Sequence, residues 1–213
     1  MIEVKRIIIV FIFVGIVAIS VVLTKCTKDD DINSAGIVVG SFTDSRDNKI
    51  YKTVKIGEQY WMSENMNYSA GGWIYNNNSV NAKTYGRLYD WITACDVCPD
   101  GWHLPSDDEW TELVDFLGGD SVAGGKLKEK DTTHWIFPNA GATNTSGFSA
   151  LPGGTRYLGG NFYGLGSDAY FWTSSEYTRT TAWRRSLSTD YNKIYKSNLF
   201  ERTYCFSVRC LKN

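Results

Sequence analysis

The stretch Cys98-Pro-Asp-Gly-Trp-His-Leu-Pro-Ser-Asp-Asp-Glu-Trp110 decides how this chain folds. Ser106 stands where a helix N-cap is expected, and Glu109, three residues later, completes a capping box that satisfies two free amide N–H groups. Apolar residues then recur with the spacing of one helix face, at Trp110, Leu113, Val114 and Leu117. The pair Gly118-Gly119 is typical of a helix end. We therefore expect a buried turn that leads into a short helix, packed against a core formed elsewhere in the chain.

Several other segments, in a fixed order, resemble the bacterial Fibrobacter succinogenes major paralogous domain. They are Tyr51–Met66, Tyr85–Trp91, Gly147–Gly154, Phe171–Ser175 and Ser207–Cys210. That domain in turn resembles the formylglycine-generating-enzyme-like branch of the C-type-lectin fold. The resemblance implies an α+β domain over residues 44–213, C-type-lectin-like, with short twisted antiparallel strands, one or two helices and long loops.

The composition agrees with a loop-rich domain and excludes one class of partner. The 213 residues carry 22 basic and 23 acidic side chains, a net charge of -1, so no strongly basic face is available for nucleic acid. The 20 glycines and the aromatic fraction of 15% favour short strands and loops over a helical bundle. Some of the aromatic residues are expected at the surface, where Tyr and Trp serve recognition.

The N-terminal residues 1–26 have the pattern of a lipoprotein signal segment. Lys5 and Arg6 precede an uncharged apolar run from Ile7 to Leu23. The segment Leu23-Thr-Lys-Cys26 resembles a lipobox, although Lys25 replaces the usual small residue, and the acidic tract that follows resembles that of Bacteroidetes surface lipoproteins. We expect lipid at Cys26 and a membrane partner through that anchor, with an uncleaved signal anchor as the alternative.

This anchor predicts an outer-membrane lipoprotein, exposed at the cell surface. Residues 27–43 are polar and are interpreted as a flexible tether between the lipid and the domain.

Within the domain, a hairpin is expected to open at Asp47-Asn48, with strands over 51–56 and 59–62 joined by a turn at Gly57-Glu58. A short helix is expected within 85–94, and the polar segment 124–130 is expected to cover one edge. The remaining strands are predicted over 169–174, 181–186 and 205–210, and Trp61, Trp135 and Trp172 are predicted to be buried.

Four cysteines remain if Cys26 carries lipid: Cys95, Cys98, Cys205 and Cys210. Disulfides are the default in an exported chain, and four cysteines allow three pairings. The resemblance implies Cys98–Cys210, which leaves Cys95–Cys205 as a second bridge. The local pairs Cys95–Cys98 and Cys205–Cys210 are an alternative, and a zinc site is a third.

The sequence predicts no enzyme, cofactor or metal. His103 and His134 are the only histidines, and no nucleophile elbow, phosphate loop or zinc-protease motif occurs. Helix capping explains the acidic run that begins at Asp107. In the formylglycine-generating relatives, oxidation relies on a cysteine pair upstream of a strand that Ser207–Cys210 resembles, but residues 183–189 contain no cysteine.

The candidate ligand surface lies within residues 170–202, because C-type-lectin-like folds present ligand sites on long loops. The residues predicted to bind are Tyr170, Arg179, Trp183, Arg184, Arg185, Tyr191, Asn192, Tyr195 and Asn198. Alternation places Trp183 and Arg185 on one strand face and Ala182 and Arg184 on the other, without deciding which face is buried.

Two main functions follow as hypotheses. The first is a surface recognition or adhesion lipoprotein that binds a protein or glycan. Its C-terminal region also resembles that of lectin-like proteins diversified by retroelements. The alternative is that this region is an ordinary polar loop region. The second is a structural envelope protein without a dedicated ligand, and a formylglycine-generating-enzyme-like enzyme is a weaker third. Because no Glu-Pro-Asn or Gln-Pro-Asp sugar motif occurs, calcium-dependent sugar binding is not expected.

Overall fold

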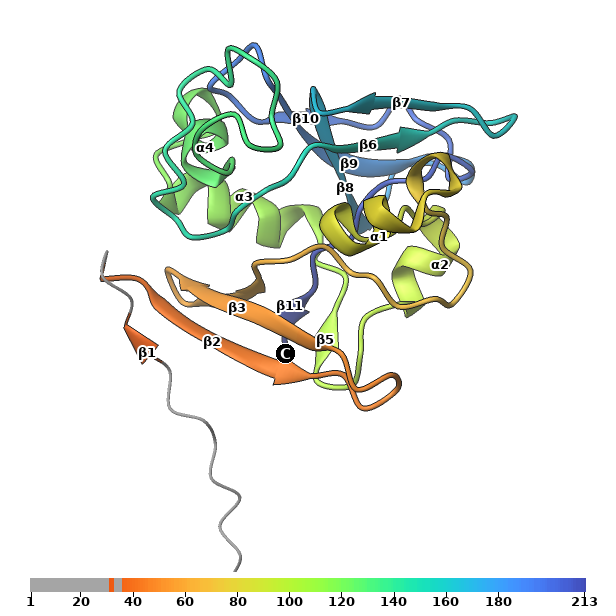
Figure 1. The fold of residues 1–213 in the computed structure, drawn as a ribbon, viewed down its shortest axis with the longest axis horizontal. Helices are drawn as coiled ribbons and strands as arrows, with labels where there is room; N and C mark the ends of the chain where they lie inside the picture. The colour runs from red at the N-terminus through yellow and green to blue at the C-terminus, as the bar shows by residue number, and fades with distance from the viewer. Residues whose placement is uncertain (1–30, 33–35) are drawn as a thin grey trace, which may run out of the picture.

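The computed structural model describes residues 31–32 and 36–213 and has an α+β architecture of two sheets with helices and long loops between them (Figure 1). The predicted signal segment and Cys26 lie outside the described residues. Within those residues, no helix is long and apolar enough to cross a membrane.

The first sheet has the strand order β1-β2-β3-β4-β11-β5. Its strands are β1 Asp31–Ile32, β2 Val38–Thr43, β3 Ile50–Ile56, β4 Gln59–Met62, β5 Trp102–His103 and β11 Leu211–Lys212. The expected hairpin with its turn at Gly57 is confirmed, since Ile56 pairs with Gln59. The tether prediction is wrong for residues 38–43, because these form β2 and pair antiparallel with β3 from Val39 to Thr43.

The second sheet has the order β10-β9-β8-β6-β7. Its strands are β6 Gly153–Arg156, β7 Phe162–Leu165, β8 Asp168–Glu176, β9 Ala182–Ser188 and β10 Tyr195–Ser197. The predicted strands over 169–174 and 181–186 are confirmed as β8 and β9. The predicted strand over 205–210 is wrong: residues 205–207 form isolated bridges with three different segments, and regular pairing begins only at Leu211.

Four α-helices, rather than one or two, occur in the described residues, together with one short 3-10 helix. They are η1 Tyr75–Asn77, α1 Ser79–Tyr85, α2 Trp91–Asp96, α3 Asp107–Phe116 and α4 Asp120–Leu127. The capping box of α3 is confirmed in both directions between Ser106 and Glu109. Helix α4 includes residues 124–127 of the polar segment that was expected to cover one edge. Its Gly124 and Gly125 are buried, and a Cβ on Gly124 would meet the carbonyl group of Lys193.

The core forms around the apolar stripe of α3. Trp110 is fully buried. The centroid of its ring lies 4.8 Å from the ring centroid of Trp61, 5.7 Å from that of Phe148 and 5.6 Å from that of Phe171. These contacts join α3 to strands of both sheets, and Figure 1 shows α3 between the two. Trp61, Trp135 and Trp172 are buried as predicted.

One disulfide, Cys98–Cys210, ties the segment before α3 to the last strand, which confirms the pairing that the resemblance implied. The second bridge is wrong, and so is the local pairing, because Cys95 and Cys205 are both free. Cys205 is fully buried beside Tyr75 and Leu88, whereas Cys95 is exposed on α2. Among the described residues, no group of three His, Cys, Asp or Glu side chains is placed to hold a metal ion.

Candidate functional site

The second sheet divides the predicted binding residues between its two faces. Trp183 and Arg185 share the face of β9 that turns toward α3, with Leu187 in the core beyond them. Ala182 and Arg184 lie on the opposite face, where aromatic residues of other segments cover them. Both arginines are buried, so the alternation identified the two faces but not their environments.

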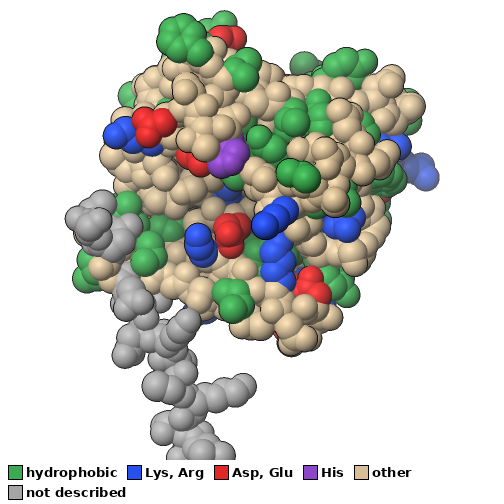
Figure 2. Space-filling view, in the orientation of Figure 1, with side chains coloured by type: hydrophobic (Ala, Val, Ile, Leu, Met, Phe, Trp, Pro, Cys, Tyr) green, Lys and Arg blue, Asp and Glu red, His purple; other side chains and the backbone are tan. Residues whose placement is uncertain are grey.

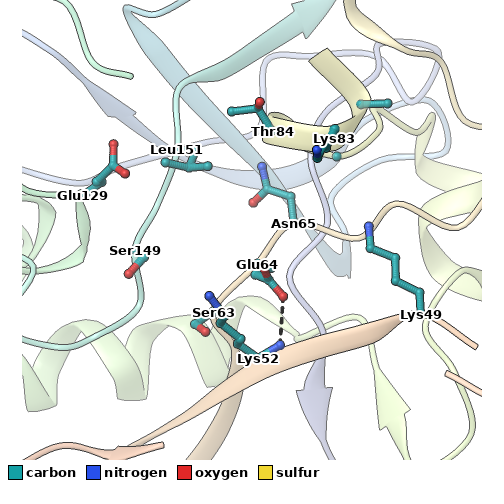
Figure 3. A pocket seen from close by; sticks show the side chains of 12 residues that line it. Lys49, Lys52, Ser63, Glu64, Asn65, Lys83, Thr84, Glu129, Ser149 and Leu151 are labelled. Carbon is teal, nitrogen blue, oxygen red and sulfur yellow. Dashed lines mark hydrogen bonds between the residues drawn. The ribbon is translucent and has the colours of Figure 1, made fainter. Parts of the chain in front are cut away.

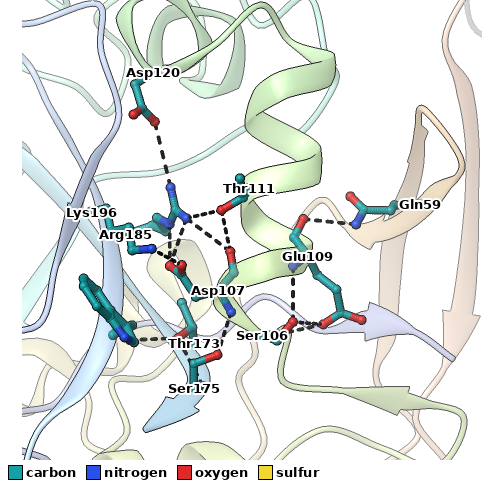
Figure 4. Close-up of polar contacts among 11 residues, drawn as sticks. Gln59, Ser106, Asp107, Glu109, Thr111, Asp120, Thr173, Ser175, Arg185 and Lys196 are labelled. Atoms are coloured by element: carbon teal, nitrogen blue, oxygen red, sulfur yellow. Dashed lines mark hydrogen bonds and ion pairs between the residues drawn. The ribbon is translucent and has the colours of Figure 1, made fainter. Parts of the chain in front are cut away.

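Arg185 belongs to a buried polar network at the start of α3 (Figure 4). Its Nε donates to Asp107 Oδ1 at 3.0 Å, and its Nη2 donates to Thr111 Oγ1 at 2.7 Å and to the Asp107 carbonyl at 3.1 Å. Lys196 Nζ approaches Asp107 Oδ2 at 2.5 Å. Arg185 is 2% exposed and Asp107 is 4% exposed. This side chain therefore compensates a buried carboxylate and fixes α3 to β9 and β10, while its role in ligand binding stays a prediction.

Trp183 remains partly accessible at the edge of this network. Its ring lies 4.3 Å from Lys196 Nζ and 5.1 Å from the ring of Tyr177, which is 54% exposed. The stacked pair of Trp183 and Lys196 therefore remains partly accessible at the surface.

Arg184 lies beneath aromatic rings on the other face of the sheet. Its guanidinium carbon is 4.1 Å from the Phe200 ring centroid and 4.8 Å from that of Tyr170. The residue is 8% exposed, and its Nε and Nη1 have no hydrogen-bond partner among the described residues. Burial lowers the pKa of Arg184 to about 10, against the opposing effect of Tyr170, Tyr157 and Asp168. Arg184 is therefore on a covered face, and its role in ligand binding stays a prediction; a buried cation with two unpaired N–H groups is an unusual feature.

The outer side of this cluster is an exposed surface of apolar and aromatic residues. We call it the aromatic surface; it consists of Tyr157, Leu158, Tyr163, Leu199, Phe200 and Tyr204. Tyr157 stacks on Tyr163 with centroids 4.8 Å apart and meets Tyr204 edge-on at 5.1 Å. Tyr163 is 50% exposed and Leu199 is 83% exposed. Phe200 and Tyr204 pack edge-on at 5.3 Å and connect this surface to the rings over Arg184.

Sequence reasoning missed the half of this surface that the β6–β7 hairpin contributes. Tyr157 and Tyr163 lie outside residues 170–202, so the expected location of the site excluded them. The available signal was the pair of Tyr residues that flank the turn at Gly159-Gly160. Tyr163 pairs with Thr155, and Tyr157 lies two residues further along the same strand face, so the two rings are diagonal neighbours across the hairpin.

The other predicted residues lie apart from this cluster. Tyr191, 52% exposed, meets Tyr195 edge-on at 5.9 Å. Asn192 is exposed, while its carbonyl accepts the N–H of Gly125 at 2.9 Å, which holds the loop on α4. Arg179 is exposed in the β8–β9 turn, and Asn198 is half-buried after β10. The nine predicted residues therefore do not form one site.

Comparison with known proteins gives one match. The family description Fibrobacter succinogenes major domain fits residues 54–212 of the chain. No curated protein and no solved structure matches it.

Proposed function

The chain belongs to the family of the Fibrobacter succinogenes major domain, and from this premise we propose that it is a cell-envelope recognition lipoprotein without catalytic activity. In this proposal, lipid on Cys26 holds the chain at the outer membrane, and the domain binds a glycan or protein through the aromatic surface. The C-type-lectin-like relation is part of the same proposal. It is supported by two short-stranded sheets, long loops and a disulfide that joins distant segments.

The observation that carries the proposal is the pairing of Arg184 with the aromatic surface. Half-exposed tyrosines offer flat rings that stack on a sugar or on apolar side chains at small entropic cost. Beneath them, the guanidinium of Arg184 keeps two N–H groups without protein acceptors. A small rotation of Phe200 would open these donors to an acceptor group of a ligand, since Phe200 is only partly buried and lies 4.1 Å from the guanidinium.

The anchor part of the proposal has a direct test. Intact-mass measurement of the mature protein should give a chain that begins at Cys26 with added lipid. A mature chain that retains residues 1–25 would contradict the lipoprotein assignment.

The recognition part is tested with the full chain in detergent micelles, applied to arrays of glycans and of purified surface proteins. Hits are measured again with the variant Tyr163→Ala/Leu199→Ser and with Phe137→Ala, a control at a side chain that is 86% exposed outside the aromatic surface. We expect a loss of about 10-fold or more for the first variant, because exposed aromatic anchors dominate such interfaces. Equal binding by both variants for every hit would refute this site.

A further inference from the structure

A second candidate site is a cavity between the two halves of the molecule, away from the aromatic surface. The cavity has a volume of about 310 Å³, within the usual range for small-ligand sites. Its walls come from the start of β3, the segment after β4, the end of α1 and the loops near residues 129 and 149–151. Figure 3 shows side chains from these segments arranged around an open space, and Figure 2 shows Lys and Arg side chains gathered near this position on the surface.

The cationic groups of the cavity form no salt bridges. Lys49 directly precedes β3, Lys52 lies in β3 and Lys83 lies in α1, and none of them forms a salt bridge with a described residue. Burial lowers the pKa of Lys49, although Glu64 and Asp47 oppose this effect. Lys49 is thus the partly desolvated ammonium group of the cavity, whereas Lys52 and Lys83 are exposed.

The two carboxylates of the cavity already have partners. Glu64 Oε2 accepts the backbone N–H of Lys52 at 2.9 Å. Glu129 accepts from His134 Nδ1 at 2.8 Å through one oxygen, with the other oxygen 2.9 Å away. Both carboxylates line the cavity, but each already accepts a hydrogen bond from the protein.

A further cation lies under the cavity floor. Arg209 is 1% exposed, and its guanidinium donates to Asn65 Oδ1 at 2.6 Å and to the carbonyls of Phe148 and Ser149 at 2.6 and 2.8 Å. No carboxylate is among its hydrogen-bond partners in the described residues. Its hydrogen bonds go to neutral dipoles, and the carboxylate of Glu64 acts on it through charge without a hydrogen bond, so the guanidinium keeps a positive potential under the cavity floor.

The floor also contains neutral polar groups and a strained residue. The hydroxyls of Ser63 and Thr84 line the cavity and make no hydrogen bond to a described residue. Ser149 has a φ of 53°, a left-handed conformation that a non-glycine residue rarely adopts and that tends to occur at functional sites. Asn144 holds Ser149 there through two hydrogen bonds. Unpaired hydroxyls beside unpaired ammonium groups suit a ligand that carries both hydroxyl and carboxylate groups.

We propose that this cavity binds a carboxylate-bearing ligand, of the kind found in an acidic sugar residue or in an acidic peptide side chain. The ammonium groups of Lys49, Lys52 and Lys83 pair with the carboxylate. This site lies on different residues from the aromatic surface and does not depend on it.

The test is calorimetric titration of the full chain in detergent micelles with three probes: a digalacturonate, the neutral digalactose of the same size, and a short glutamate-rich peptide. We expect the digalacturonate to bind with a Kd of about 1 mM or tighter at low salt, and more weakly as salt is added. The peptide as the better probe would also support the carboxylate chemistry and identify the source as a polypeptide. Equal binding of the neutral sugar, or no binding of either acidic probe, would overturn the proposal.

Variants locate the binding. The triple variant Lys49→Gln/Lys52→Gln/Lys83→Gln should weaken digalacturonate binding by roughly 10- to 100-fold, since each partly exposed pair contributes modestly. The control Lys55→Gln/Lys193→Gln/Lys212→Gln removes the same charge elsewhere and should leave binding within about 2-fold. An equal loss in both triple variants would mean nonspecific attraction and would refute the site. Tyr163→Ala should not change this binding, so failure of either proposal is distinguishable from failure of the other.

Discussion

The buried pair of Asp107 and Arg185 gives the sharpest prediction of stability. We expect Asp107→Asn to lower the free energy of unfolding by about 3 to 5 kcal/mol, because it leaves a guanidinium that is 2% exposed without its carboxylate. Asp120 does not substitute for it, since its carboxylate is 3.9 Å from Arg185 Nη1 and is 69% exposed.

Arg185→Met should lower the free energy of unfolding by less, about 1 to 3 kcal/mol, because Asp107 keeps its contact with Lys196 at 2.5 Å. The double variant should be less destabilised than the sum of the two single variants by about 2 kcal/mol. The measurement is urea unfolding followed by tryptophan fluorescence under non-reducing conditions, with the slope against urea checked for constancy.

Asp108→Asn is the matched control. It removes the same charge from the same turn of α3, but Asp108 is exposed, so the expected cost is about 0.3 to 1 kcal/mol from the helix dipole. If Asp107→Asn and Asp108→Asn cost the same, or if the effects of Asp107→Asn and Arg185→Met are additive, the reasoning about this network is refuted.

Three further outcomes are expected. Replacing Cys98 and Cys210 with serine should lower stability by about 5 kcal/mol in urea unfolding, from a sequence separation of 112 residues; a change below about 1 kcal/mol would contradict the chain-entropy argument. Burial raises the pKa of Glu109, but hydrogen bonds from Ser106 and His103 outweigh burial and hold this pKa below its usual value. The contribution of Glu109 to stability is therefore present above pH ~4.3 and is lost as pH falls through the lowered pKa, so thermal unfolding of Glu109→Gln should be less sensitive to acid in that range. Burial raises the pKa of the Cys95 thiol to about 11, so alkylation of native protein at pH ~8 should be far slower than that of an unperturbed thiol in mass spectrometry; equal rates would contradict the assignment.

Local signals carried the parts of the fold that were predicted correctly. The capping box of Ser106 and Glu109, the apolar stripe of α3 and the turn at Gly57 depend on residues close in sequence, which fix helix ends and hairpins. The disulfide was expected from the resemblance alone, since spacing left three pairings open.

The errors came from tertiary contacts that override local preference. Strand β2 contains Val38, Val39 and Phe42, but Gly40 and Ser41 interrupt its strand pattern, and its pairing with β3 completes the strand. Helix α4 contains Gly124 and Gly125, which are poor helix formers, yet their lack of a side chain allows the backbone near residue 193 to approach closely. The sequence left open which of Arg184 and Arg185 is buried; in the structure both are, because aromatic rings cover Arg184 and Asp107 compensates Arg185.

The same reasoning explains the outcome at the candidate site. Sequence could identify a segment rich in recognition residues and the two faces of its strand, but it could not show which groups cover each face of β9. It also could not show that Tyr157 contacts both Tyr163 and Tyr204, because the contact with Tyr204 depends on tertiary packing.

The position of β11 has a consequence for how this chain acquires its structure. Leu211 pairs with Trp61 on one side and with His103 on the other, so the strand that joins β4 to β5 comes almost 150 residues after β4. The first sheet therefore cannot join β4 to β5 until residue 211 has been synthesised and has paired with both strands. Contacts between residues so far apart in the sequence form slowly. A chain that must stay unfolded during transport through a membrane would benefit from this delay. We expect ribosome-bound chains that end before residue 205 to remain protease-sensitive, and resistance to appear only once residues 210–212 are available for pairing.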